Sequence, residues 1–209
     1  MAEVRLSTVV VASRNPGKVA EFRRLLEPTG WRVLSLDEAP RGDETSWEEN
    51  APTYLGNALI KAVAAASTTK LPSLADDSGV EVAALGGWPG LRTARWLGEE
   101  ATSTQLREGL QARVAELPES QRHAAFVCAL ALALPEDRHP AAAVTAEARV
   151  EGDLLPAPRG SAGFGYDPIF IPDGETRTMA ELPPAEKDAR SHRGRAVRAL
   201  LAALERAAP

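Results

Sequence analysis

The chain has a single cysteine, so an intrachain disulfide is excluded. Cys128 stands in the apolar run AAFVCALALAL, where a buried and inert thiol is expected. A nucleophilic cysteine requires electropositive and partly exposed surroundings, which this run does not provide. The sequence therefore supports neither a disulfide scaffold nor cysteine catalysis.

Long hydrophobic segments and excess positive charge are also missing. No stretch approaches the roughly 20 apolar residues that span a bilayer, and the apolar run near the N-terminus is too short for a signal-peptide core. A formal net charge of −5 argues against bulk binding to duplex nucleic acid. We therefore expect a cytoplasmic protein with no membrane and no nucleic-acid partner, although a small anionic ligand in a locally basic pocket is compatible with this charge.

The remaining composition is that of a globular protein, with 44% hydrophobic and 25% charged residues. No linker stands out, so residues 1–209 are expected to form one domain. The β-branched run Ser7–Ala12 predicts a buried strand, Val19 begins a pattern of helical spacing, and Trp31–Leu36 predicts a second strand. Ala124–Leu134 reads as a central strand. This alternation of strands and helices agrees with an α/β fold.

Two adjacent carboxylates follow the apolar residues 71–75. Neighbouring side chains of an extended backbone point to opposite faces, so Asp76 and Asp77 are expected in different environments, one facing the structure and one a cleft. A strand-end carboxylate followed by Ser78 and a glycine suits Mg²⁺ with bound phosphate oxygens. The same residue types are typical of a plain turn, and the pattern alone leaves both interpretations open.

Two further segments could bind an anion. A strand, the polar loop Ser13–Lys18 and a helix follow one another, an order that directs backbone N–H groups and a helix dipole at an anion. Lys18 opposes the dipole in the first turn, which a nearby phosphate would explain. The next helix carries Asn57 and Lys61 four residues apart on one face. Both segments could equally be an ordinary turn and a solvated helix face.

Two C-terminal segments complete the pattern. Glycines surround Phe164, so the backbone could approach a flat ligand that stacks on this ring, or the aromatics could belong to a glycine-bent β-segment of the core. Ser191 is placed to cap the closing amphipathic helix. His192 and Arg193 follow this serine. The pattern alone leaves open whether their role is structural or functional.

Five segments together resemble one family, and they occur in its order from about Val10 to Leu200: ASRNPGK, TYLGNALIKA, LADDSGVEVAALGGWPGLRTARW, GFGYDPIF and EKDARSHRGRA. This is the inosine triphosphatase family, also called Ham1-like or non-canonical purine nucleoside triphosphate pyrophosphatases. The resemblance implies a two-lobed α/β fold, with a long mixed twisted sheet flanked by helices and a central cleft, and a homodimer. It also implies Mg²⁺-dependent hydrolysis of inosine, deoxyinosine and xanthosine triphosphates to the monophosphate and pyrophosphate, which clears deaminated purines from the nucleotide pool.

The resemblance also implies roles for individual residues. Asp77 matches the carboxylate that binds Mg²⁺ and accepts the proton of the attacking water, and either Glu48 or Glu49 matches a second carboxylate toward the metal. The expected substrate-binding residues are Ser13, Arg14, Asn15, Pro16, Gly17 and Lys18 in the triphosphate loop, Asn57 and Lys61 at the phosphates, Ser78 and Arg95 on the substrate side, Phe164, Gly165, Tyr166 and Asp167 around the base, and Lys187, His192 and Arg193 for base recognition.

This chain departs from the family pattern in two places. Arg14-Asn15 stands where two asparagines are frequent, and Gly56 stands inside a helix where a bulkier residue is usual. These departures affect the detail of the loop and the helix, and two other functions stay open apart from them: a pyrophosphatase for other modified nucleoside triphosphates, and a nucleotide-binding protein without turnover. Asp77 argues against the second.

Overall fold

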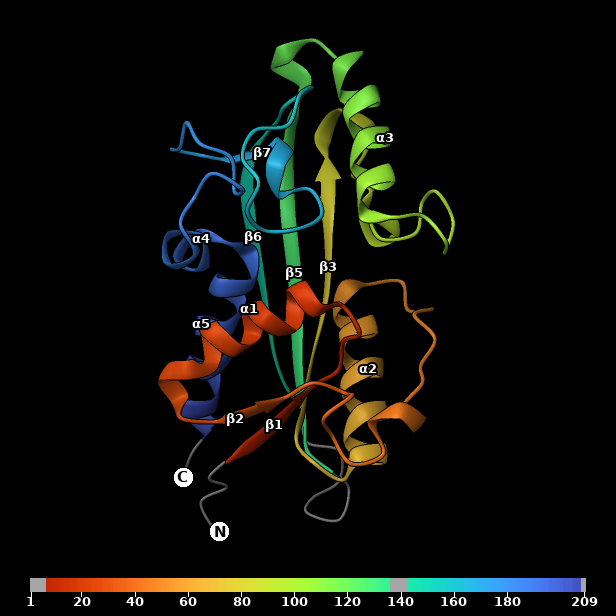
Figure 1. Ribbon diagram of the computed structural model, residues 1–209, viewed down its shortest axis with the longest axis vertical. Coiled ribbons are helices and arrows are strands. Elements are labelled where there is room, and N and C mark those ends of the chain that lie inside the picture. Colours follow the sequence, from red (N-terminus) through yellow and green to blue (C-terminus); the bar gives the residue numbers. More distant parts are fainter. Residues whose placement is uncertain (1–6, 136–142, 208–209) are drawn as a thin grey trace. The chain divides into compact units, whose positions relative to one another are not determined.

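The computed structural model describes residues 7–135 and 143–207 (Figure 1). The strands of its sheet are β1 (Thr8–Val11), β2 (Arg32–Leu34), β3 (Ser73–Val82), β4 (Trp88–Pro89), β5 (His123–Ala133), β6 (Ala143–Leu154) and β7 (Phe170–Pro172). Their order is β2-β1-β3-β5-β6-β7, with β4 on β3. β1 is parallel to β2 and β3, whereas β4 on β3 and β7 on β6 are antiparallel. The predicted α/β class with a mixed sheet is confirmed.

In the described part of the chain, three helices lie in connections between these strands, and two follow the last strand. They are α1 (Pro16–Leu26), α2 (Tyr54–Thr69), α3 (Ser103–Ala115), α4 (Pro184–Arg190) and α5 (His192–Ala207), joined by short 3₁₀ turns. No helix within residues 7–135 and 143–207 is long and apolar enough to cross a membrane. Cys128 is fully buried on β5, as expected.

The chain divides into two compact units. Unit 1 comprises Met1–Asp77, Cys128–Glu147 and Ala196–Pro209, and unit 2 comprises Ser78–Val127 and Ala148–Arg195. Each unit has its own hydrophobic core. The core of unit 1 packs the alanine-rich face of α2 on β1, β3 and β5, and its members include Val10, Leu36, Ala58, Ala62, Ala66, Ala75 and Ala129. The core of unit 2 includes Val80, Leu110, Phe126, Ile169, Phe170 and Met179.

The predicted strand ending near Ala75 is too short, because β3 continues through both carboxylates to Val82. Beyond Asp77 the chain supplies Val80 and Val82, and the latter faces Trp88 of β4 across an antiparallel pair. The alternative of a turn at Asp76–Gly79 is therefore wrong. The carboxylates lie within a regular strand, so their side chains alternate between its two faces.

Candidate active site

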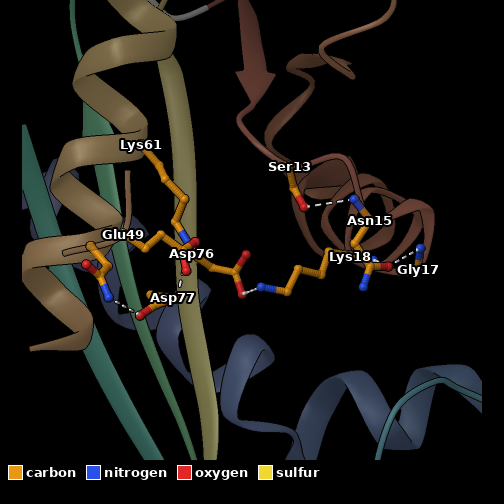
Figure 2. Close-up of polar contacts among 9 residues, drawn as sticks. Ser13, Asn15, Gly17, Lys18, Glu49, Lys61, Asp76 and Asp77 are labelled. Carbon is orange, nitrogen blue, oxygen red and sulfur yellow. Dashed lines mark hydrogen bonds and ion pairs between the residues drawn. The ribbon is translucent and has the colours of Figure 1, made fainter. Parts of the chain in front are cut away.

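Asn15 organises the start of α1. Its side-chain oxygen accepts hydrogen bonds from the backbone N–H of Gly17 at 2.9 Å and of Lys18 at 3.3 Å (Figure 2). Its own N–H donates to Ser13 Oγ at 3.2 Å, and Pro16 occupies the first helical position, where an N–H has no helical partner anyway. The predicted phosphate loop is thus an ordered helix start, in which an anion would compete with Asn15 for two donors.

Lys18 extends from this helix to a buried carboxylate. Its Nζ lies 3.0 Å from Asp76 Oδ2, and the Asp76 side chain is only 1% exposed. This ion pair explains a lysine in the first turn without requiring a phosphate, because it offsets the unfavourable dipole. Asp76 thus holds Lys18 beside the loop.

Asp77 has different partners from its neighbour. Its Oδ2 accepts a hydrogen bond from Asn57 Nδ2 at 3.1 Å, and its Oδ1 lies 3.1 Å from Lys61 Nζ. Asn57 Oδ1 accepts from the backbone N–H of Ala51 at 3.0 Å, which directs the amide nitrogen of Asn57 toward the carboxylate. Asn57 and Lys61 are both buried. The alternative of a solvated α2 face is therefore wrong for these two residues.

The acidic segment before α2 contributes one of its two candidate carboxylates to this cluster. Glu49 Oε1 lies 2.7 Å from the same Lys61 Nζ, whereas Glu48 is exposed. Two contacts fix the segment: Trp47 packs on the core of unit 1, and Arg14 Nη2 donates to the carbonyl of Thr45 at 2.8 Å. The unusual Arg14 therefore links the first loop to the segment that carries Glu49.

Several carboxylates act on the Lys61 ammonium. Burial favours the neutral amine, but Asp77, Asp76 and Glu49 together outweigh burial and raise the pKa of Lys61. Burial raises the pKa of Asp77, although Lys61 and Asn57 act in the opposite direction. One ammonium thus lies within ion-pair distance of two carboxylates.

The donor set fits a magnesium ion that also binds substrate. Among the described residues, no group of three or more histidine, cysteine, aspartate or glutamate side chains is placed to hold a metal ion. The resemblance implied only two carboxylates, Asp77 and one of Glu48 and Glu49. Two carboxylates do converge, however, and Mg²⁺ commonly takes one or two carboxylates and completes its shell with water and phosphate oxygens.

In unit 2, the predicted base-recognition residues lie in α4 and at the start of α5, on either side of a short turn. Ser191 Oγ accepts a hydrogen bond from the N–H of Gly194 at 3.0 Å, as the predicted cap should. A Cβ on Gly194 would lie 1.7 Å from the carbonyl oxygen of Asp188, so only glycine fits here. This tight turn brings His192 and Arg193 directly after the helix that carries Lys187, and all three are buried.

Asp167 joins two of the predicted base-site segments. Its Oδ2 accepts hydrogen bonds from Lys187 Nζ at 2.7 Å and from the backbone N–H of Phe164 at 2.8 Å. Gly163 makes room for this carboxylate, since a Cβ there would lie 2.2 Å from the same oxygen. Asp167 therefore positions both the lysine and the aromatic loop.

The Phe164 ring has two cations near it. Lys187 Nζ lies 5.2 Å and Arg193 Cζ 5.1 Å from the ring centroid, within the range of cation–π attraction. The His192 ring packs edge-on to Phe126 at 5.0 Å between centroids. Unit 2 thus places an aromatic face and several hydrogen-bond donors together, as the sequence predicted.

Tyr166 supports this loop from the interior of unit 2. Its hydroxyl donates to the carbonyl of Thr93 at 2.9 Å and accepts from Trp96 Nε1 at 3.1 Å. Burial raises the pKa of Tyr166 to about 12. The sequence placed Tyr166 in the base pocket, but its hydroxyl binds protein groups. No sequence pattern indicated that Trp96 would be one of its partners. Arg95 lies beside Trp96 in the same segment, and Ser78 follows Asp77 on β3.

Removing this hydroxyl should measurably destabilise the protein. We expect Tyr166→Phe to lower the free energy of unfolding by about 1–3 kcal/mol, because the partly buried Trp96 N–H and Thr93 carbonyl lose their partner. Denaturant unfolding followed by circular dichroism measures the change. Tyr166→Phe in a Trp96→Phe background should cost less than in the wild type, and equal costs in both backgrounds would contradict the proposed coupling.

Comparison with known proteins places these clusters in a family. The sequence profile of the Ham1 family matches residues 9–203. The chain belongs to the Ham1 family. A dITP/XTP pyrophosphatase from Frankia alni is 49% identical to this Ham1 chain over 197 residues, which cover 92% of this chain and 94% of the relative. A dITP/XTP pyrophosphatase from Mycobacterium tuberculosis is 46% identical over 205 residues, which cover 95% and 96%.

Solved Ham1 structures have the same fold. A HAM1 protein from Coxiella burnetii superimposes with a TM-score of 0.80 at 38% identity. The match covers 96% of this chain and 100% of that chain. A nucleoside-triphosphatase described as a dITP/XTP pyrophosphatase from Mycobacterium abscessus gives a TM-score of 0.67 at 45% identity, covering 93% and 98%. The family resemblance drawn from the five sequence segments is confirmed.

Proposed function

We propose that this Ham1 protein hydrolyses deoxyinosine, xanthosine and inosine triphosphates to the nucleoside monophosphate and pyrophosphate, and so removes deaminated purines from the nucleotide pool. The relatives named dITP/XTP pyrophosphatases match it over nearly the whole chain. The observation that carries the proposal is the cluster that the buried Asp77, Asn57 and Lys61 form with the partly exposed Glu49, on β3, α2 and the segment before α2.

The residues of unit 1 suit the triphosphate and the hydrolytic step. Lys18 and Lys61 provide ammonium groups for phosphate oxygens, and positioning with charge neutralisation dominates reactions at phosphorus. Asp77 and Glu49 would hold Mg²⁺, which when bound lowers the pKa of a water ligand and neutralises phosphate charge. Asp77 accepts the proton of the attacking water. Asn57 keeps the Asp77 carboxylate oriented for this step.

The residues of unit 2 suit a 6-keto purine. Hypoxanthine and xanthine have an acceptor oxygen at the position where adenine carries an amino donor. Lys187, His192 and Arg193 can donate to this oxygen while Phe164 stacks on the ring. A buried donor that faces an amino group stays unpaired, which disfavours adenine strongly.

A substrate panel tests the proposed activity. Pyrophosphate release should be fast with deoxyinosine, xanthosine and inosine triphosphates and slower by orders of magnitude with ATP. Faster release from a modified pyrimidine triphosphate would assign a different substrate class, and no release from any nucleotide would leave a binding protein without turnover. Chelation of divalent ions should stop release, and undiminished release would reject the Mg²⁺ requirement.

Base discrimination should depend on His192. We expect His192→Ala to narrow the ratio of kcat/KM for inosine over adenosine triphosphate by about tenfold to a hundredfold, since one buried donor is worth about 1–3 kcal/mol. Steady-state kinetics with both nucleotides measures the ratio. His123→Ala, at an exposed histidine of unit 2, is the matched control. An unchanged ratio in His192→Ala would place base recognition elsewhere.

Three features expected from the sequence stay predictions. They are the homodimer, the cytoplasmic location, and the arrangement of residues 1–209 as one domain with a central cleft. Measurements of sedimentation and activity on the intact protein can test the predicted homodimer.

A further inference from the structure

Lys61 holds the position between two carboxylates that a cation would take. Its Nζ is 3.1 Å from Asp77 Oδ1 and 2.7 Å from Glu49 Oε1, and Figure 2 shows its side chain running from α2 into this pair. The lysine side chain is only 5% exposed. Its ammonium is therefore held mainly by the two acidic partners rather than by solvent.

Another lysine of unit 1, Lys18, is also held by a carboxylate. Lys18 Nζ lies 3.0 Å from Asp76 Oδ2, and Figure 2 shows the two side chains extended toward each other. Both lysines assigned to phosphate in the proposed function are thus paired with carboxylates of β3. Only Lys61, however, contacts the two carboxylates whose oxygens fit a divalent ion.

We propose that Lys61 is a resident cation that competes with the divalent metal for Asp77 and Glu49, and that metal binding releases its ammonium for a phosphate oxygen of the substrate. The inference deepens the proposed function and rests on it. A divalent ion carries twice the charge of the ammonium, so it attracts these two carboxylates more strongly. The displaced ammonium then carries its full charge toward the phosphates.

The exchange couples the two binding events. A metal ion must displace Lys61 to bind the free enzyme, so its affinity there is reduced. Phosphate binding without metal must also separate Lys61 from its carboxylates. Each ligand removes an obstacle to the other, so metal and triphosphate strengthen each other's binding by the same factor. Lys61 therefore makes the site prefer the metal–nucleotide complex over either component.

Replacement of Lys61 should have opposite effects on the two ligands. Mn²⁺ is the probe, and its binding to the nucleotide-free enzyme is followed by electron paramagnetic resonance of the free ion at fixed pH and salt. We expect Lys61→Gln to bind Mn²⁺ at least about tenfold more tightly than the wild type. In the presence of Mg²⁺, the same variant should bind a non-hydrolysable α,β-methylene analogue of inosine triphosphate at least about tenfold more weakly.

Lys18→Gln is the matched control. It removes the same charge from the same unit, but Lys18 contacts Asp76 rather than the proposed metal ligands. Its Mn²⁺ affinity should stay within about threefold of the wild type while its affinity for the analogue falls. A Lys61→Gln variant that binds Mn²⁺ equally or more weakly than the wild type would overturn the inference. Wild-type pyrophosphate release tests the proposed function separately, so the two failures are distinguishable.

A measurement on the wild type covers the case in which Lys61→Gln does not fold. The chain has four lysines, Lys18, Lys61, Lys70 and Lys187, so ¹⁵N-lysine labelling gives a simple ammonium spectrum. Lys18→Gln and Lys187→Gln assign the buried signals. Adding Mg²⁺ without nucleotide should move the Nζ resonance of Lys61 and leave that of Lys187 in place, and an unmoved Lys61 resonance at saturating Mg²⁺ would also overturn the inference.

Discussion

Asp77→Asn should lower kcat for inosine triphosphate by about 10³-fold, within the range that a lost general base costs. Asparagine keeps the size of the side chain but cannot accept the proton, and it offers one acceptor oxygen where Asn57 and Lys61 now find two. Binding of the α,β-methylene analogue should change only a few-fold. Steady-state pyrophosphate release and calorimetric titration measure these two quantities.

The neighbouring carboxylate provides the control. Asp76 lies on the same strand and is as deeply buried, but its partner is Lys18. Asp76→Asn should therefore reduce stability and phosphate affinity while retaining far more turnover than Asp77→Asn. Near-normal kcat in Asp77→Asn, or a larger loss of kcat in Asp76→Asn, would reject Asp77 as the proton acceptor.

Asp167→Ala should cost about 3–5 kcal/mol of unfolding free energy, because it leaves the buried ammonium of Lys187 without its carboxylate. The Phe164 N–H loses its acceptor at the same time. We also expect weaker binding of inosine triphosphate, since the lysine and the aromatic loop are no longer held together. Chemical denaturation and a binding titration give both values.

Removal of both partners distinguishes this ion pair from simple loss of packing. In the variant that combines Asp167→Ala with Lys187→Met, no uncompensated charge remains, so stability should recover in part relative to Asp167→Ala alone. If the two substitutions instead add in full, Asp167 does not act through Lys187.

The parts of the fold that sequence predicted correctly depend on local pattern. The β-branched run around Val10 and the apolar run around Cys128 form strands in which nearly every side chain is buried. Ser191 caps α5 through a contact only three residues away. Such features need no knowledge of distant residues.

The parts that sequence could not predict depend on distant partners. Two adjacent aspartates look like a turn, and they remain in a strand because Lys18 and Lys61 neutralise them from separate helices. Helix α4 was not predicted, since Lys187 is its only fully buried residue and its burial depends on Asp167. The choice between Glu48 and Glu49 likewise depends on which carboxylate reaches Lys61.

The division of the chain into interleaved segments has a consequence for folding during synthesis. Unit 2 is complete when Arg195 has left the ribosome, but unit 1 still lacks its last segment, Ala196–Pro209. The first segment of unit 1, which includes β1, α1 and α2, must therefore wait for the C-terminal part of α5 before its packing is complete. Pairing of segments so distant in sequence is slow. Unit 1 is consequently expected to complete its packing after unit 2.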